Sequence, residues 1–134
     1  MNQVGATRWV RSGVVGLVAF GGAFALTAVA VFVYAFRLAL AARGAPDQGA
    51  IQAFARSVGP TWGPWLRILL ACGLAAWVAR SSRSVAVEGA VVGLVAGIAG
   101  LCLAWPPDTR GALFLLGTIG AALVGAFAGR RRPS

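Results

Sequence analysis

Hydrophobic positions along the chain gather into four long stretches that contain almost no charge. Residues 12–36, 89–107 and 111–129 carry no charged residue, and residues 61–79 carry one, Arg67. A bilayer core of about 30 Å is crossed by about 20 mostly apolar residues in a helix. The pattern therefore predicts an all-α fold, an integral membrane four-helix bundle in a single membrane domain of residues 1–134, with spans over residues 13–40, 61–79, 85–105 and 111–129.

Charged and helix-breaking residues mark where the spans end. Residues 1–12 read as a short polar arm, and the first span is longer than a bilayer requires, so Arg37 near its far end can extend its guanidinium to the headgroups. We expect this helix to stop around residues 43–46, because Gly and Pro together disfavour its continuation. The short segments 80–84 and 106–110 predict tight turns, which make the spans on either side of each turn antiparallel neighbours.

Residues 48–58 show a periodic pattern instead of a fully apolar one. Their apolar residues recur at i, i+3, i+4 and i+7, which places them on one helical face, and Asp47 is positioned to cap the first turn. We predict a short amphipathic helix lying on the membrane surface between the first two spans; a lid or a partner-docking element is the alternative. Pro60 or Pro64 then begins the second span, since proline suits the first turn of a helix. The apolar face consists of Ile51, Phe54, Ala55 and Val58.

The composition and charge indicate contact with lipid instead of nucleic acid. The sequence is 59% hydrophobic and 11% charged, its mean hydropathy is +0.82, and its net charge of +9 includes twelve arginines and no lysine. The arginines stand at the ends of apolar stretches, where they anchor helices and meet anionic lipid, and no basic face interleaved with aromatic residues lies outside the spans. We therefore exclude nucleic acid as a partner and predict lipid headgroup contacts for Arg80, Arg83, Arg130, Arg131 and Arg132.

The distribution of arginine predicts the orientation. Four spans place both termini on one side, which carries seven arginines, while the other side carries five. By the positive-inside rule both termini are cytoplasmic, in a multi-pass protein of the plasma (inner) membrane. The difference of two arginines leaves dual topology open.

Small residues recur every four positions in the third and fourth spans. A four-residue step keeps residues on nearly one helix face, and faces of small residues let the backbones of membrane helices approach closely. We predict that these are packing faces, either within the bundle or between protomers. The residues are Gly89, Gly93 and Gly97 in the third span and Gly117, Ala121, Gly125 and Gly129 in the fourth.

Two charged residues within the spans, Glu88 and Arg67, are candidates for an ion or proton site. Glu88 is the only acid inside a predicted span, and a carboxylate within a membrane is a functional candidate. The alternative is a carboxylate at the start of a helix that is satisfied by Arg80, Arg83 or the helix dipole. Arg67 lies one turn inside the second span, where an arginine can still reach the headgroups.

The sequence lacks the patterns of an enzyme. It contains no histidine, and Cys72 and Cys102 stand alone inside spans, where they are expected to pack as small apolar residues. Paired carboxylates, a base beside Ser or Cys, and a phosphate-binding loop are missing as well. We predict that the protein is not an enzyme and has no catalytic residue, no cofactor and no metal site.

The second to fourth spans resemble a recurrent pattern. Residues 75–80 read Ala-Ala-Trp-Val-Ala-Arg, residues 88–94 read Glu-Gly-Ala-Val-Val-Gly-Leu, and the final span is rich in Gly and Ala. In these features the chain resembles uncharacterised small four-helix bacterial membrane proteins. The resemblance implies the four-helix membrane fold and brings no activity or binding residue with it.

Together these features predict a small polytopic integral membrane protein that acts as a non-enzymatic accessory or assembly subunit. In this hypothesis the Gly-rich helix faces make the contacts, and the partners are the lipid bilayer and either further copies of the chain or a larger membrane complex. The alternative is a small oligomeric transporter or channel that uses Glu88.

Overall fold

The described part of the chain folds into four helices. The computed structural model describes residues 3–80, 84–103 and 108–130, which form α1 (Gln3–Ala42), α2 (Gln48–Ala79), α3 (Val85–Leu103) and α4 (Thr109–Arg130). The predicted all-α, four-helix fold is confirmed, and each of these helices is long and apolar enough to cross a membrane. Arg83, Arg131, Arg132 and the last two residues of the predicted third span, 104–105, lie outside the described residues.

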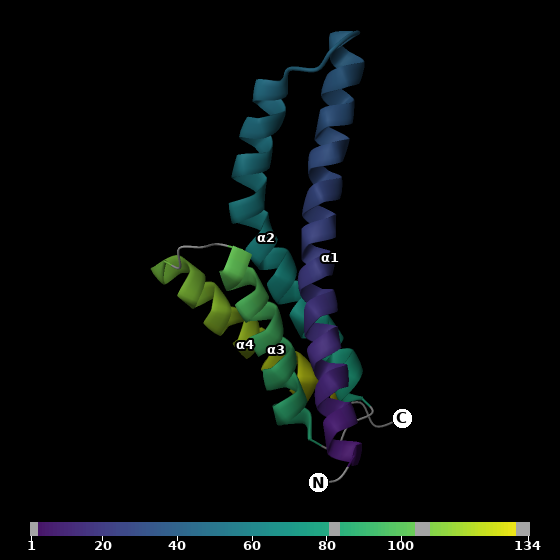
Figure 1. The fold of residues 1–134 in the computed structure, drawn as a ribbon, viewed down its shortest axis with the longest axis vertical. Coiled ribbons are helices and arrows are strands. Elements are labelled where there is room, and N and C mark those ends of the chain that lie inside the picture. The colour runs from purple at the N-terminus through teal and green to yellow at the C-terminus, as the bar shows by residue number, and fades with distance from the viewer. Residues whose placement is uncertain (1–2, 81–83, 104–107, 131–134) are drawn as a thin grey trace.

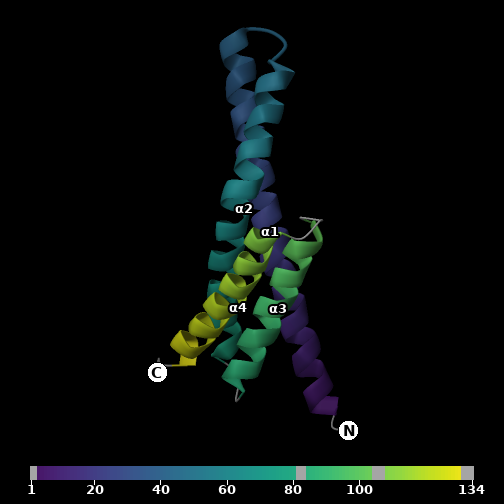
Figure 2. The same ribbon diagram turned by 90° about the vertical axis from the view of Figure 1, so that its left-hand side faces the viewer.

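All four helices pack together in one half of the molecule, and α1 and α2 extend beyond this half. α1 and α2 make a long hairpin, and the shorter α3–α4 hairpin packs along only one half of it (Figure 1, Figure 2). Within the described residues α2 contacts the other three helices, whereas α1 and α4 do not contact each other. Thr27 on α1 and Gly63 on α2 line one cavity with Leu103, the last residue of α3. We therefore call residues 28–62 the projecting hairpin and the remainder of the four helices the base.

Small residues fill the interior of the base, while large apolar residues point outward. Leu69 on α2 and Val124 on α4 expose 68% and 67% of their surfaces. Since lipid removes the hydrophobic drive between helices, membrane helices associate by close packing of small residues, and this distribution fits that rule. The completely buried alanines are Ala19, Ala71, Ala96, Ala122 and Ala126.

The prediction of a separate amphipathic helix over residues 48–58 is wrong. α2 runs without a break from Gln48 to Ala79, with Pro60 and Pro64 inside it. Proline disfavours a helix because it lacks an N–H and because its Cδ clashes with the Cβ of the preceding residue. Each of these prolines follows a glycine, which has no Cβ, so that clash is relieved. The missing backbone hydrogen bonds remain, as does the clash of each ring with the carbonyl four residues earlier, and together they account for the change of direction along α2 in Figure 1.

The apolar face predicted for residues 48–58 packs against α1. Ile51, Phe54, Ala55 and Val58 are all half-buried, and the ring of Phe54 stacks on Tyr34 of α1 with ring centroids 3.9 Å apart. The first half of α2 runs alongside α1 (Figure 1, Figure 2). The helical period of this segment is as predicted, but its apolar face packs against another helix of the same chain and not against the membrane surface.

α1 extends beyond the predicted span at both ends. It begins at Gln3, so most of the expected polar arm is helical, and Arg8 and Ser12 from this segment line a cavity together with α3. Packing against α3 thus supports the helical conformation of the first residues of α1. At the other end α1 stops at Ala42, and Arg43 has a φ of 47°. A residue in this left-handed conformation ends a helix, within the segment where the stop was predicted.

Candidate functional site

The predicted packing glycines of α3 face α4. A Cβ placed on Gly89 would lie 2.8 Å from the Cβ of Ala126, and one placed on Gly93 would lie 2.7 Å from the Cα of Ile119. Gly97 lies against the side chain of Leu115. Carbon atoms pack best about 3.5–4.0 Å apart, so any larger residue at Gly89 or Gly93 would push the two helices apart.

The predicted packing glycines of α4 face α2. A Cβ on Gly125 would overlap the backbone carbonyl of Cys72, and one on Gly129 would overlap that of Ala76. Gly117 lies more loosely beside Ile68, and Ala121 is half-buried. α4 therefore packs on α3 and α2 with two different faces, and the small-residue faces of α3 and α4 are covered by helices of the same chain.

Two further glycines, which are not among the predicted packing residues, also lie close to a neighbouring helix. A Cβ on Gly16 of α1 would lie 2.8 Å from the carbonyl oxygen of Val92, and one on Gly100 of α3 would overlap the guanidinium of Arg67. Gly100 continues the stripe of Gly93 and Gly97 at the next helical step, and this spacing is the feature of the sequence that indicates its close packing. Gly16 belongs to the Val-Val-Gly-Leu-Val-Ala segment that residues 14–19 share with residues 91–96.

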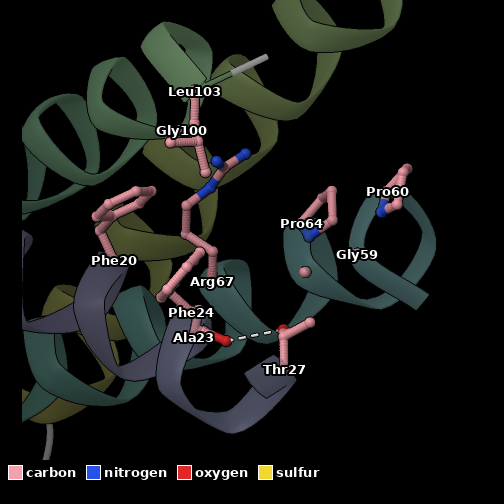
Figure 3. Close-up of a pocket in the computed structure, with 11 residues that line it drawn as sticks. Phe20, Ala23, Phe24, Thr27, Gly59, Pro60, Pro64, Arg67, Gly100 and Leu103 are labelled. Carbon is pink, nitrogen blue, oxygen red and sulfur yellow. Dashed lines mark hydrogen bonds between the residues drawn. The ribbon is translucent and has the colours of Figure 1, made fainter. Parts of the chain in front are cut away.

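Arg67 lies in a cavity where the base meets the projecting hairpin. The cavity has a volume of about 350 Å³ and is lined by α1, α2 and the end of α3. Figure 3 shows the Arg67 side chain extending from α2 toward Gly100 and Leu103, with Phe20 on one side and Pro64 on the other. The hydroxyl of Thr27, which also lines the cavity, donates a hydrogen bond to the carbonyl of Ala23 at 2.9 Å. Arg67 is the charged residue of an otherwise mostly apolar lining.

Within the described residues the Nε of Arg67 is buried and has no hydrogen-bond partner. The chain has three acids, and none of them lines this cavity. The Asp47 carboxylate accepts from the N–H of Gly49 at 2.9 Å, and the Asp108 carboxylate accepts from the N–H of Gly111 at 2.7 Å, so both cap helices. Glu88 lies in a different cavity. The guanidinium of Arg67 thus lies in this cavity without a carboxylate from the described residues.

Glu88 lies in the first turn of α3 and is only 8% exposed. It lines a cavity of about 160 Å³ together with Arg8 and Ser12 of α1. The position in the first turn agrees with stabilisation by the helix dipole, while the expected neighbour Arg80 is not part of this lining. α1 supplies the surroundings of Glu88, and a sequence pattern local to α3 does not reveal them.

The structure does not bring Glu88 and Arg67 together. Arg67 meets α3 at Gly100, which is about 18 Å along the helix axis from Glu88 at 1.5 Å per residue. Between these two levels Ala19, Val92 and Ala96 are completely buried. The interface of α1 and α3 is therefore closed between the two cavities.

Of the arginines predicted to meet headgroups, the structure describes Arg80 and Arg130, and both lie at helix ends. Arg80 is the C-cap of α2 and Arg130 is the last residue of α4, and both are exposed. The guanidinium of Arg11 lies over the ring of Trp77 at 5.8 Å from its centroid. The start of α1 and the end of α2 thus meet at the same end of the base.

The projecting hairpin carries exposed apolar residues on the outer face of α1. Phe32, Phe36 and Leu40 expose 70%, 57% and 65% of their surfaces. The same hairpin carries three exposed arginines, and its one acid, Asp47, caps α2. The exposed surface of the hairpin is thus apolar and basic; the arginines are Arg37, Arg43 and Arg56.

Comparison of the chain with protein-family models, with curated proteins and with solved structures finds no match.

Proposed function

We propose that this chain is a multi-pass integral membrane protein that serves, without catalytic activity of its own, as an accessory subunit of a larger membrane complex. The observation that carries the proposal is the projecting hairpin, where the apolar outer face of α1 continues past the level of Leu103, the last described residue of α3. The Gly-rich faces, which the sequence suggested as the contact with a partner, are covered by helices of the same chain. The contact surface is the outer face of α1.

The length of this face exceeds what lipid can cover. Exposed apolar residues follow the outer side of α1 from Val10 to Leu40, a distance of about 45 Å along the helix. The hydrocarbon core is about 30 Å thick, and burying the whole face in it would need a tilt of about 48°, beyond the observed range of about 0–40°. α3, with 19 residues, matches the bilayer at about 28 Å. A bilayer placed around the base therefore leaves Phe32, Phe36 and Leu40 for protein to cover.

The charges around this face select the kind of partner. Arg37, Arg43 and Arg56 are exposed on the same hairpin, and Asp47 is engaged with the backbone N–H groups of α2. A second copy of the chain would bring these arginines together, and like charges at an interface are unfavourable. The partner we propose is a different membrane protein that presents an apolar helix bordered by acidic side chains.

The same helix ends support the orientation predicted from the sequence. The start of α1 and the ends of α2 and α4 lie at one end of the base (Figure 1) and carry Arg8, Arg11, Arg80 and Arg130. With the seven arginines counted for this side in the sequence against five for the other, the positive-inside rule favours the cytoplasm for this end, in the plasma (inner) membrane, and dual topology stays the alternative. The projecting hairpin then extends from the opposite side of that membrane.

Photocrosslinking in the native membrane tests this proposal. A photoreactive amino acid at Phe36 is expected to give one discrete adduct with a different polypeptide. The matched control is the same amino acid at Leu116 of α4, which is similarly exposed at 64% but lies on the base, and it should give no such adduct. Reversing the charge of Arg37 and Arg43 to Glu is expected to lower the yield at Phe36, since the partner is acidic there.

Three outcomes would overturn the accessory role. An adduct at Phe36 with the mass of two copies of the chain would show self-association. The same products from Phe36 and Leu116 would show contact with lipid or random neighbours. A yield that is unchanged by the charge reversals would remove the argument for an acidic partner.

A second candidate, a transporter or channel that uses Glu88, is favoured by the cavity in which this buried carboxylate lies. The closed interface at Ala19, Val92 and Ala96 favours the accessory role instead. Purified protein in liposomes distinguishes them by ion and proton flux. We expect wild type and Glu88→Gln to behave identically, whereas a flux of the wild type that the variant lacks would establish transport.

A further inference from the structure

The cavity at Arg67 combines an apolar wall with a single cation. Phe20, Phe24 and Leu103 contribute large apolar surfaces, and Pro60 and Pro64 form the side that belongs to α2 (Figure 3). Its volume of about 350 Å³ is within the range of small-molecule sites, which are about 300–1,000 Å³. Such sites are mostly apolar, with a few polar groups that fix the orientation of the ligand. This lining suits a ligand that is mostly hydrocarbon.

Arg67 is fixed in position but its donors are not fully used. Its guanidinium lies against the Cα of Gly100, where a Cβ would overlap Nη1, so a glycine is required for the arginine to take this position. Within the described residues its buried Nε has no acceptor, and no acid lines the cavity. A buried donor without an acceptor is unfavourable, and the planar fork of a guanidinium matches the two oxygens of a phosphate or carboxylate.

We propose that this cavity binds an anionic amphiphile. Its phosphate or carboxylate head accepts hydrogen bonds from Arg67, and its alkyl chain lies along Phe20, Phe24 and Leu103. A purely polar anion would leave the apolar wall unmatched, and a neutral hydrocarbon would leave the Arg67 donors without an acceptor. The inference is independent of the partner proposed for the projecting hairpin.

The position of the cavity connects it with the bilayer. It lies at the end of α3, and the nearby Trp62 and Trp65 on α2 are 62% and 56% exposed. Exposed tryptophans gather at the level of lipid headgroups. Two sources of the same chemistry reach this level, a phospholipid of the membrane and a free fatty acid.

The test is a binding titration of the purified full chain in a non-ionic maltoside detergent, followed by tryptophan fluorescence and by native mass spectrometry. The probes are dioctanoyl phosphatidylglycerol, dodecanoate and the neutral dioctanoylglycerol. Wild type is expected to bind one molecule of an anionic probe and to bind the neutral one much more weakly. Arg67→Gln should raise the Kd for the anionic probe about tenfold or more, because a hydrogen bond to a charged group is lost.

Arg56→Gln is the matched control. Arg56 is an exposed arginine of the same helix that does not line the cavity, so the variant has the same net charge as Arg67→Gln. We expect its Kd to equal that of wild type. Gly100→Ala is the second variant, since it keeps the charge but its Cβ displaces the guanidinium. It should weaken binding, whereas Gly120→Ala on α4, which meets no atom within 4 Å, should not.

Each outcome bears on the site. Tighter binding of phosphatidylglycerol identifies a membrane phospholipid as the source, tighter binding of dodecanoate identifies a fatty acid, and both support the cavity. Equal weakening by Arg67→Gln and Arg56→Gln would overturn it, because binding would then depend on net charge alone. Equal affinity for dioctanoylglycerol, or no saturable binding by folded wild type, would overturn it as well. If Arg67→Gln does not fold, the comparison of Gly100→Ala with Gly120→Ala decides.

Discussion

At the residue scale, the packing of α4 against its neighbours depends on what each glycine meets. Gly125 and Gly129 lie directly against backbone carbonyls of α2, and Gly93 lies against the Cα of Ile119. Backbone cannot rotate away from an added methyl group as a side chain can. Gly117, which is near only the end of the Ile68 side chain at 3.6 Å, has room for a larger residue. The four-residue repeat thus contains both demanding and tolerant positions.

Gly125→Ala should therefore destabilise the base. Its Cβ would overlap the carbonyl of Cys72, and we expect the free energy of unfolding to fall by about 1–3 kcal/mol, as for other overpacked interiors. The matched control is Gly120→Ala on the same helix, which faces open space and should leave stability unchanged or raise it by up to about 1 kcal/mol through helix propensity. Reversible unfolding in mixed micelles, followed by circular dichroism, measures both. Equal stability of the two variants would contradict the close approach of α4 and α2.

The small-residue stripes were visible in the sequence, but their partners were not. A stripe at a period of four identifies a face that can approach another helix, and this holds for Gly89 and Gly93 as for Gly125. Which helix covers the face depends on how all four helices are arranged around one another. For the same reason the sequence does not show the role of Gly100, because this role depends on Arg67, a residue of another helix.

At the scale of the element, α2 is where local sequence signals and the structure differ most. The sequence predicts that Pro60 or Pro64 begins a helix, because proline by itself suits the first turn. The glycine before each proline changes the result, because it removes the Cβ that makes the helical conformation unfavourable at that position. The packing of Phe54 on Tyr34 of α1 then supports the first half of the helix. In α3 and α4, which contain no such competing signals, the described helices start at Val85, as predicted, and at Thr109, two residues before the predicted span.

Gly59→Ala should loosen the junction within α2. The added Cβ meets no atom of another helix within 4 Å, so its effect comes from the clash with the ring of Pro60. We expect faster amide hydrogen exchange over residues 48–58. Gly73→Ala is the control, because it lies in the same helix, also in open space, and precedes a leucine. Its exchange should be as slow as in wild type. If both variants exchange alike, the glycine before proline is not what keeps α2 continuous.

At the scale of the whole molecule, the division into a base and a projecting hairpin assigns different surroundings to parts of the same helix. α1 is apolar along almost its whole length, so its sequence alone does not show where the membrane ends. That level follows from the described end of α3, where Leu103 lines a cavity with Thr27 and Gly63. The candidate site at Arg67 arises at this level because three helices meet there, and no segment of the sequence contains it by itself.

The projection of the hairpin can be measured in liposomes that contain only this protein. In a background in which Cys72 and Cys102 are replaced by Ala, spin labels are attached to cysteines at Phe36, Ser57 and Val124. All three residues are exposed, and Val124 lies on the base. We expect a water-soluble nickel complex to relax the labels at Phe36 and Ser57 strongly, and oxygen, which concentrates in hydrocarbon, to relax the label at Val124.

The label at Phe36 is the decisive one. A helix of residues 48–58 lying flat on the membrane would still leave Ser57 near water, but it would place Phe36 inside a span of residues 13–40 and therefore in hydrocarbon. In the projecting arrangement Phe36 lies beyond the level of Leu103, by about 13 Å counted from Thr27. A Phe36 label that responds like the Val124 label would therefore reject the projecting hairpin, and with it the surface through which the accessory subunit is proposed to hold its partner.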